Sequence, residues 1–117
     1  MSTDKEFIKL PDSELEVMQA IWTLHAEGEK LISAGLVMKR FPDLCRLKLT
    51  TVLTLITRLQ NKGFIRSEKL GRSNCYTPLI DAAEYRRFVA EDFVIRAYLG
   101  NRDQLIADLT QAQTASK

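Results

Sequence analysis

The residues with the clearest capacity for chemistry are the cations of residues 46–72. This segment has seven Lys and Arg against one Glu, a net charge of +6. Residues 1–45 have a net charge of −3 and residues 81–117 a net charge of −1. A short basic segment in an otherwise mildly acidic chain is typical of a surface that binds a polyanion. The alternative is a solvent-exposed surface without a ligand, because charged side chains must contact water in any folded protein. They are Arg46, Lys48, Arg58, Lys62, Arg66, Lys69 and Arg72.

Threonine and arginine recur along one face of a predicted helix at Leu49–Lys62. If the apolar stripe Val52, Leu55, Ile56 and Leu59 is buried, helical geometry directs seven other residues outward. Threonine can bond phosphates or contact a thymine methyl group, and arginine can bind guanine or phosphate with two hydrogen bonds. Leu53 fits either a thymine contact or an isolated exposed leucine. The outward residues are Thr50, Thr51, Leu53, Thr54, Thr57, Arg58 and Asn61.

The residues after this helix change from helical to strand-forming types. Phe64, Ile65 and Tyr76 favour strands, and Gly71–Asn74 favours a turn. We therefore expect antiparallel strands near residues 64–69 and 74–79. Basic residues on this hairpin would contact phosphates, or else protect an edge strand from pairing. The expected DNA-binding residues are Lys48, Thr50, Thr51, Thr54, Arg58, Lys62 and Arg72.

Hydrophobic periodicity gives the elements that must position these residues. Three helices followed by a hairpin predict a winged helix-turn-helix, whose third helix enters the major groove. The expected fold is mainly α with a small β-hairpin, followed by C-terminal dimerisation helices. We expect a DNA-binding domain over residues 1–80 and a helical dimerisation region over 81–117. The expected helices cover residues 11–24, 30–41, 49–62, 81–99 and 101–113.

The two C-terminal helices carry more apolar residues than a solvated helix needs. A second copy of the chain in a symmetric dimer would cover them. The alternative is packing against the first helix of the same chain. The residues expected to join two protomers are Phe93, Leu105, Ile106 and Leu109.

Composition argues against several other classes of protein. One histidine and two cysteines, Cys45 and Cys75, offer neither a metal site nor a disulfide framework. No motif gathers the acid–base groups of an enzyme. The apolar stretches are too short to span a membrane, and residues 1–6 lack the apolar core of a signal peptide. We therefore expect a cytoplasmic protein with no enzymatic activity, no cofactor and no direct membrane binding.

Two segments resemble the penicillinase repressors, the BlaI/MecI/CopY group. They are Leu10-Pro11-Asp12-Ser13-Glu14-Leu15-Glu16-Val17-Met18 with Ile21-Trp22, and Thr51-Val52-Leu53-Thr54-Leu55-Ile56-Thr57-Arg58-Leu59 followed by Lys62-Gly63-Phe64-Ile65. The likeness runs from about Leu10 to Leu109. It implies a dimeric repressor that binds a palindromic operator with TACA/TGTA-like half-sites. The regulated genes would encode a β-lactamase, related resistance proteins or metal export. Thr51, Thr54 and Arg58 match positions on the family's DNA-reading helix.

The sequence departs from the family's pattern in three places. The copper-responsive branch has a cysteine-rich C-terminal motif, and the tail here has no cysteine, which argues against copper sensing. In the β-lactam branch a membrane sensor-protease cuts an Asn-Phe bond, whose place is taken here by Asp108-Leu109. That protease is kept as a candidate partner without an assigned cleavage site. Relatives often continue with another helix, which implies here a smaller dimer interface or a shortened C-terminus.

A winged helix used for protein–protein contact is the main alternative function, since a fold does not determine a function. Such a module would present an apolar or acidic third helix, whereas this one presents threonines and arginine within the +6 segment. A regulator that answers another signal is a further alternative. The expected function is a dimeric DNA-binding repressor of a palindromic operator that controls β-lactam resistance or related genes.

Overall fold

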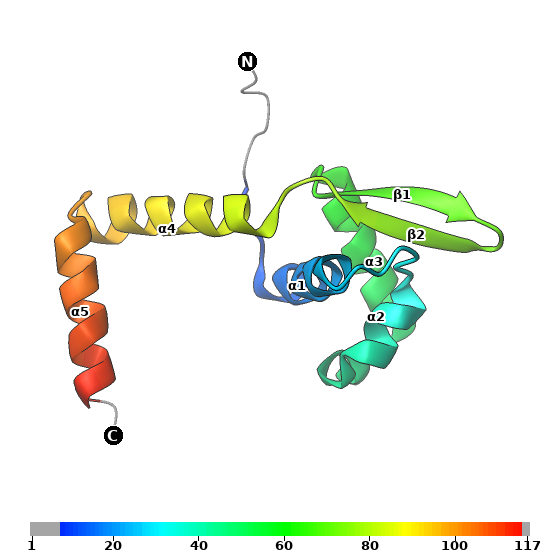
Figure 1. The fold of residues 1–117 in the computed structure, drawn as a ribbon, viewed down its shortest axis with the longest axis horizontal. Helices are drawn as coiled ribbons and strands as arrows, with labels where there is room; N and C mark the ends of the chain where they lie inside the picture. Colours follow the sequence, from blue (N-terminus) through cyan, green and yellow to red (C-terminus); the bar gives the residue numbers. More distant parts are fainter. Residues whose placement is uncertain (1–7, 116–117) are drawn as a thin grey trace, which may run out of the picture. The chain divides into compact units, whose positions relative to one another are not determined.

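The computed structural model describes residues 8–115, which form helices and one antiparallel hairpin in two compact units (Figure 1). The first unit ends at Ala82 and the second begins at Ala83. The mainly α fold with a small hairpin is confirmed. The elements are α1 Asp12–Ala26, α2 Ala34–Arg40, the 3₁₀ helix η1 Pro42–Arg46, α3 Leu49–Asn61, β1 Ile65–Leu70, β2 Ser73–Pro78, α4 Ala82–Tyr98 and α5 Arg102–Ala115.

The core of the first unit lies between α1, α2, α3 and the base of the hairpin, which contact one another. Helix α3 buries the predicted stripe, and Phe64, the largest of the fully buried side chains, lies in the turn after it. Burying such side chains stabilises the fold by about 1.5–3 kcal/mol each, so this packing is the main stabilising term of the unit. The fully buried large residues are Val17, Met18, Ile21, Leu24, Ile32, Val37, Val52, Ile56, Leu59, Phe64 and Ile65.

Helix α3 ends in a Schellman motif that turns the chain into the hairpin. The amide of Phe64 donates to the carbonyl of Leu59, and the amide of Gly63 donates to that of Gln60, both at 3.0 Å. Gly63 has φ +82°, a left-handed conformation that favours glycine. The end of the helix therefore agrees with the sequence pattern. The turn carries Phe64 directly into the core.

The hairpin extends away from the three helices (Figure 1). Its pairing runs from Ile65↔Pro78 to Leu70↔Ser73, so each strand lies one residue from the predicted position. Gly71 has φ +67°, whereas Arg72 lies outside the left-handed region. A two-residue loop with only its first residue at positive φ matches a type II′ turn. The turn places Arg72 at the tip.

Helix α2 is shorter than the periodicity predicts, and the expected start at Lys30 is wrong. The Ser33 hydroxyl accepts a hydrogen bond from the Leu36 amide at 3.1 Å, so the helix begins at Ala34. The carbonyl of Ile32 accepts the Tyr76 amide at 2.8 Å. Ile32 thus bonds to β2 rather than within a helix, and the helix begins only after Ser33.

A buried acid joins α1 to the end of α3. Glu14 is 3% exposed, and its Oε1 accepts a hydrogen bond from Lys62 Nζ at 2.5 Å. A carboxylate this deeply buried needs a charged partner to offset its lost hydration. A second long-range bond holds α1, since Trp22 Nε1–H donates to the Ile80 carbonyl at 2.8 Å. The first bond ties α1 to the end of α3, and the second ties α1 to the residues that follow β2.

The second unit consists of α4 and α5, joined by polar contacts near their shared turn. Tyr98 donates its hydroxyl to Asp108 at 2.9 Å, and this bond raises the pKa of the Tyr98 phenol. Arg102 is paired with Glu91 at 2.7 Å. The side chain of Asn101 accepts a hydrogen bond from the Gln104 amide, so Asn101 caps the N-terminus of α5 as expected. Over residues 8–115, no helix has the length and apolar character needed to cross a membrane.

We expect Lys62→Met to lower the free energy of unfolding by about 2–3 kcal/mol, because it leaves the buried Glu14 carboxylate without its charged partner. Denaturant unfolding followed by the fluorescence of Trp22, the single tryptophan, measures this. Arg46→Met is the matched control. Its ion pair with Glu16 is exposed, so its removal should cost less than about 1 kcal/mol. Equal effects of the two substitutions would contradict a special role for Glu14.

Candidate nucleic-acid interface

Helix α3 has the two faces that its sequence predicts. Its four stripe residues are buried, and each predicted outward residue, from Thr50 to Asn61, is exposed. The periodicity therefore predicted the orientation of this helix correctly. One face is committed to the core, which leaves the threonines and Arg58 on the surface.

The structure separates the cations of residues 46–72 into two groups. Arg46 and Lys62 are paired with Glu16 and Glu14 of α1. The hydrogen bond to Glu16 raises the pKa of the Arg46 guanidinium. Among the described residues, the other five have no ion pair and lie exposed on the hairpin and around α3. These five, the open cations, are Lys48, Arg58, Arg66, Lys69 and Arg72.

The open cations suit a polyanion because their charge is not neutralised within the chain. Phosphate groups are the partners that exposed Lys and Arg bind in nucleic acids. Phosphate contact by Lys62 stays a prediction, and we leave that residue out of the interface because Glu14 already neutralises its ammonium group.

The N-terminus of α3 is also suited to an anion. Lys48 is the N-cap residue, no side chain bonds the free amides there, and the first turn has no acidic residue. By contrast, the Ser33 side chain caps α2. Free amides and the helix dipole give a positive potential at this end. A phosphate placed there would also meet Lys48.

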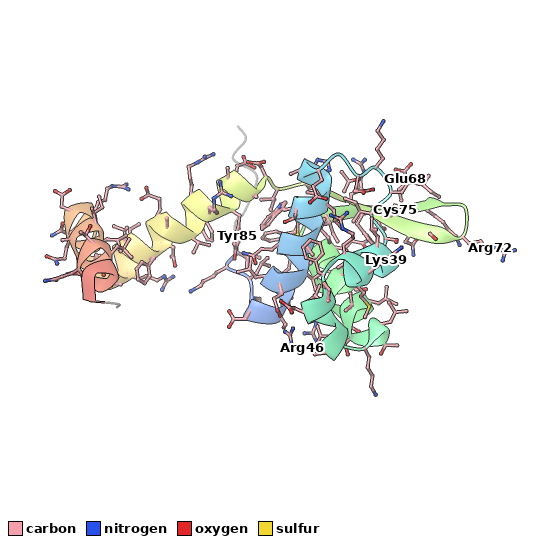
Figure 2. All side chains as sticks on the ribbon, turned by 60° about the horizontal axis from the view of Figure 1, so that its bottom comes forward. Lys39, Arg46, Glu68, Arg72, Cys75 and Tyr85 are labelled. Carbon is pink, nitrogen blue, oxygen red and sulfur yellow. The ribbon has the colours of Figure 1, made fainter. Side chains whose placement is uncertain are left out.

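The tip of the hairpin presents Arg72 to solvent. Figure 2 shows its side chain at the outer end of the hairpin, directed away from the helices. The short turn holds the backbone of Arg72 between two paired strands. Arg66 and Lys69 lie on the neighbouring strand β1 and are exposed. The hairpin thus presents three cations along its length.

Two threonine side chains bond within the helix, a feature that sequence reasoning missed. Thr54 donates its hydroxyl to the Thr50 carbonyl, and Thr57 donates to the Leu53 carbonyl, each at 3.0 Å. Hydroxyls in helices often bond the carbonyl four residues earlier, so the spacing held a signal for this. These two hydroxyl protons are not free to bond DNA.

The cysteines and acidic groups that the structure describes form no second site. Cys75 is a free, buried thiol on β2, and the structure does not describe the Cys45 side chain. Burial raises the pKa of the neighbouring Tyr76 phenol. Within residues 8–115, no group of three or more His, Cys, Asp or Glu side chains is placed to hold a metal ion.

Three packed helices followed by a two-stranded hairpin, with the open cations on the third helix and hairpin, define a winged helix-turn-helix protein. The family model of the penicillinase repressors matches residues 10–117. The chain therefore belongs to the penicillinase repressor family, as its two resembling segments predicted. The family is one of transcriptional repressors and not of enzymes.

Individual relatives agree with this assignment. The chain is 30% identical to the penicillinase repressor of Bacillus licheniformis, over 92% of this chain and 80% of that protein. It is 25% identical to the methicillin resistance regulatory protein MecI of Mammaliicoccus sciuri, over 97% of this chain and 89% of that protein. The solution structure of the DNA-binding domain of the repressor BlaI matches with a TM-score of 0.55 and 33% identity. This match covers 69% of this chain and 93% of that domain.

We expect Arg58→Ala and Arg72→Ala to weaken DNA binding in different ways. Arg58 lies on the outward face of α3, so its removal should cost about 1–3 kcal/mol and relax the preference for one base pair. Arg72→Ala, at the hairpin tip, should weaken binding of all sequences alike and lower the salt slope by about one unit. Fluorescence anisotropy with specific and random duplexes at several salt concentrations distinguishes the two.

Arg46→Ala is the control for these variants, since the Arg46 charge is already neutralised by Glu16. Its affinity for both duplexes should stay within about twofold of the native chain. A base-specific effect of Arg72→Ala would mean that the hairpin reads sequence. Unchanged binding by Arg58→Ala would remove that residue from the interface.

Proposed function

We propose that the chain acts in the cytoplasm as a homodimeric transcriptional repressor that binds double-stranded operator DNA. The recognition helix is α3, and the hairpin contacts the flanking phosphates. The observation that carries this proposal is the placement of the five open cations around the exposed face of α3 and along the hairpin. A surface with unpaired cations around a helix that fits the major groove suits DNA.

The DNA contacts divide by the chemistry of each side chain. Lys48, with the free amides at the start of α3, and Arg72, at the hairpin tip, are placed for phosphates. Thr50, Thr51 and Thr54 lie on the exposed face of α3 with Arg58, which can bind guanine or phosphate. Phosphate contacts fix the register, and contacts on this face distinguish bases.

The second unit supports dimerisation. This unit, which begins at Ala83, is below the roughly 40-residue size at which a domain usually folds without a partner. Phe93 is 47% exposed, and Ile106 and Leu109 are each 61% exposed. Leu105 is half-buried beside them on α5. A second copy of the chain would cover these side chains.

A symmetric dimer carries two recognition helices related by a two-fold axis. Its operator must therefore be an inverted repeat. The family resemblance suggests TACA/TGTA-like half-sites and genes of β-lactam resistance or related functions. The relatives named for penicillinase and methicillin resistance support this assignment of regulated genes.

We propose that a protease cannot cut the Asp108–Leu109 bond in the folded chain, so induction by cleavage would need a conformational change first. The Asp108–Leu109 bond lies inside α5, and Asp108 accepts hydrogen bonds from both Tyr98 and Gln104. A protease needs an extended chain, so α5 would have to open locally before any cut. A membrane sensor-protease would act on this chain only after such opening.

Selection from duplexes with a random central segment tests the proposed function directly. The native chain should enrich an inverted repeat, with TACA/TGTA-like halves spaced for two recognition helices. An enriched site without two-fold symmetry would contradict the dimer. No enrichment, with binding of a protein partner instead, would favour the protein-contact function of the fold.

The double substitution Ile106→Asp and Leu109→Asp should split the dimer, because it would bury two carboxylates at the proposed contact. Both side chains are exposed in the single chain, so the unit's own packing is spared. Sedimentation should show a monomer, and affinity for the selected duplex should fall and depend strongly on protein concentration. Gln111→Asp, at an exposed polar position of the same helix, should leave both properties unchanged. A double variant that stays dimeric would place the interface elsewhere.

A further inference from the structure

Four exposed residues of α3 form one continuous strip. They are spaced three or four residues apart, so helical geometry places them side by side. Leu53 lies in the middle and is 38% exposed. Lys48 and Arg58 lie at the two ends of the helix and have no ion pair among the described residues. We call this the α3 strip: Thr50, Leu53, Thr54 and Thr57.

The surface of the α3 strip is more apolar than its composition suggests. Each threonine hydroxyl has one proton, and those of Thr54 and Thr57 are donated to carbonyls within the helix. With its oxygen held against the backbone, each of these side chains has its methyl group as the remaining heavy atom on the outer side. The strip therefore presents those two methyl groups around the isobutyl group of Leu53.

An apolar strip can distinguish bases in the major groove. Thymine alone among the four bases carries a methyl group there, whereas guanine presents only acceptors. Leu53 has no donor, and Thr54 and Thr57 have none to spare, so these residues cannot bond guanine. A thymine methyl group would be stabilised against such a surface by van der Waals attraction and by its removal from water.

We propose that the α3 strip recognises thymine through its C5-methyl group, with Leu53 as the main specificity-determining residue. The occupant is the major groove of B-form DNA, because the strip lies between open cations that complement the phosphates on either side. This inference rests on the proposed function, since it assigns base specificity to the same helix. It predicts thymines in each half-site opposite Leu53, whatever the rest of the operator.

Replacing thymine with deoxyuridine tests the proposal, because it removes the methyl group and leaves base pairing intact. The probe is the duplex that the native chain selects from the random pool, made with thymine or with deoxyuridine in both half-sites. The native chain should bind the deoxyuridine duplex about fourfold more weakly for each methyl group removed from the interface. This ratio of affinities is the readout for every variant.

Leu53→Ala should bring that ratio close to one. Leu79→Ala is the matched control, since Leu79 is a leucine of similar exposure, 44%, outside the helix. It should keep the native ratio. Because the ratio is measured within one variant, a change in the active fraction of protein does not affect it. The thermal transition of Trp22 fluorescence verifies that each variant is folded.

Two substitutions of Thr54 separate its methyl group from its hydroxyl. Thr54→Val keeps the methyl group and should keep the ratio within about twofold of the native ratio. Thr54→Ser keeps only the hydroxyl and should lower both the affinity for the thymine duplex and the ratio. A large decrease with valine and none with serine would show that the hydroxyl reads the base, and would overturn the proposal.

The outcomes separate this inference from the proposed function. Equal binding of thymine and deoxyuridine duplexes by the native chain would overturn the inference while DNA binding stands. A native ratio that survives Leu53→Ala would assign thymine recognition to another residue and overturn it too. If the native chain selects no duplex from the pool, both the proposed function and this inference fail.

Discussion

The two-faced packing of α3 is the constraint on which the rest of the structure depends. Its four stripe residues are buried, so the rotation of the helix about its axis is set by the core. A rotated helix would expose leucine and isoleucine, and each would cost about 1.5–3 kcal/mol. Core packing and surface chemistry are therefore coupled in one helix, because the same rotation that buries the stripe presents Thr50, Leu53, Thr54 and Arg58.

Electrostatics within the first unit concentrates positive charge on the same surface. The acids Glu14 and Glu16 of α1 neutralise two cations of the basic segment, Lys62 and Arg46, which lie on either side of α3 in the sequence. The cations around α3 and along the hairpin keep their charge. Among the described residues of this segment, positive charge without a partner is therefore confined to the five open cations, which are fewer than its seven Lys and Arg. This suits a groove with phosphates on both sides and base edges in the middle.

The second unit leaves apolar surface exposed to solvent. Two helices cannot enclose a core of their own, and several large apolar side chains of α4 and α5 are exposed. Their polar contacts, such as Tyr98 with Asp108, hold the two helices as a pair. A dimer through this pair would double the number of phosphate contacts. Under the proposed function, repression would then depend on protein concentration, because one protomer would make fewer phosphate contacts than the dimer.

Local patterns in the sequence determined the order of helices and hairpin and the direction of the α3 faces, though not the start of α2, because helical periodicity and turn chemistry act over a few residues. The two segments that resemble the penicillinase repressors were also recognisable from the sequence alone. Only the tertiary structure decided three other features: Ile32 pairs with Tyr76, Lys62 is held by Glu14, and the Thr54 hydroxyl bonds within its helix. The first two join residues 44 and 48 positions apart in the sequence, a proximity that no local pattern encodes. The third depends on a side-chain rotamer, which residue spacing permits but does not select.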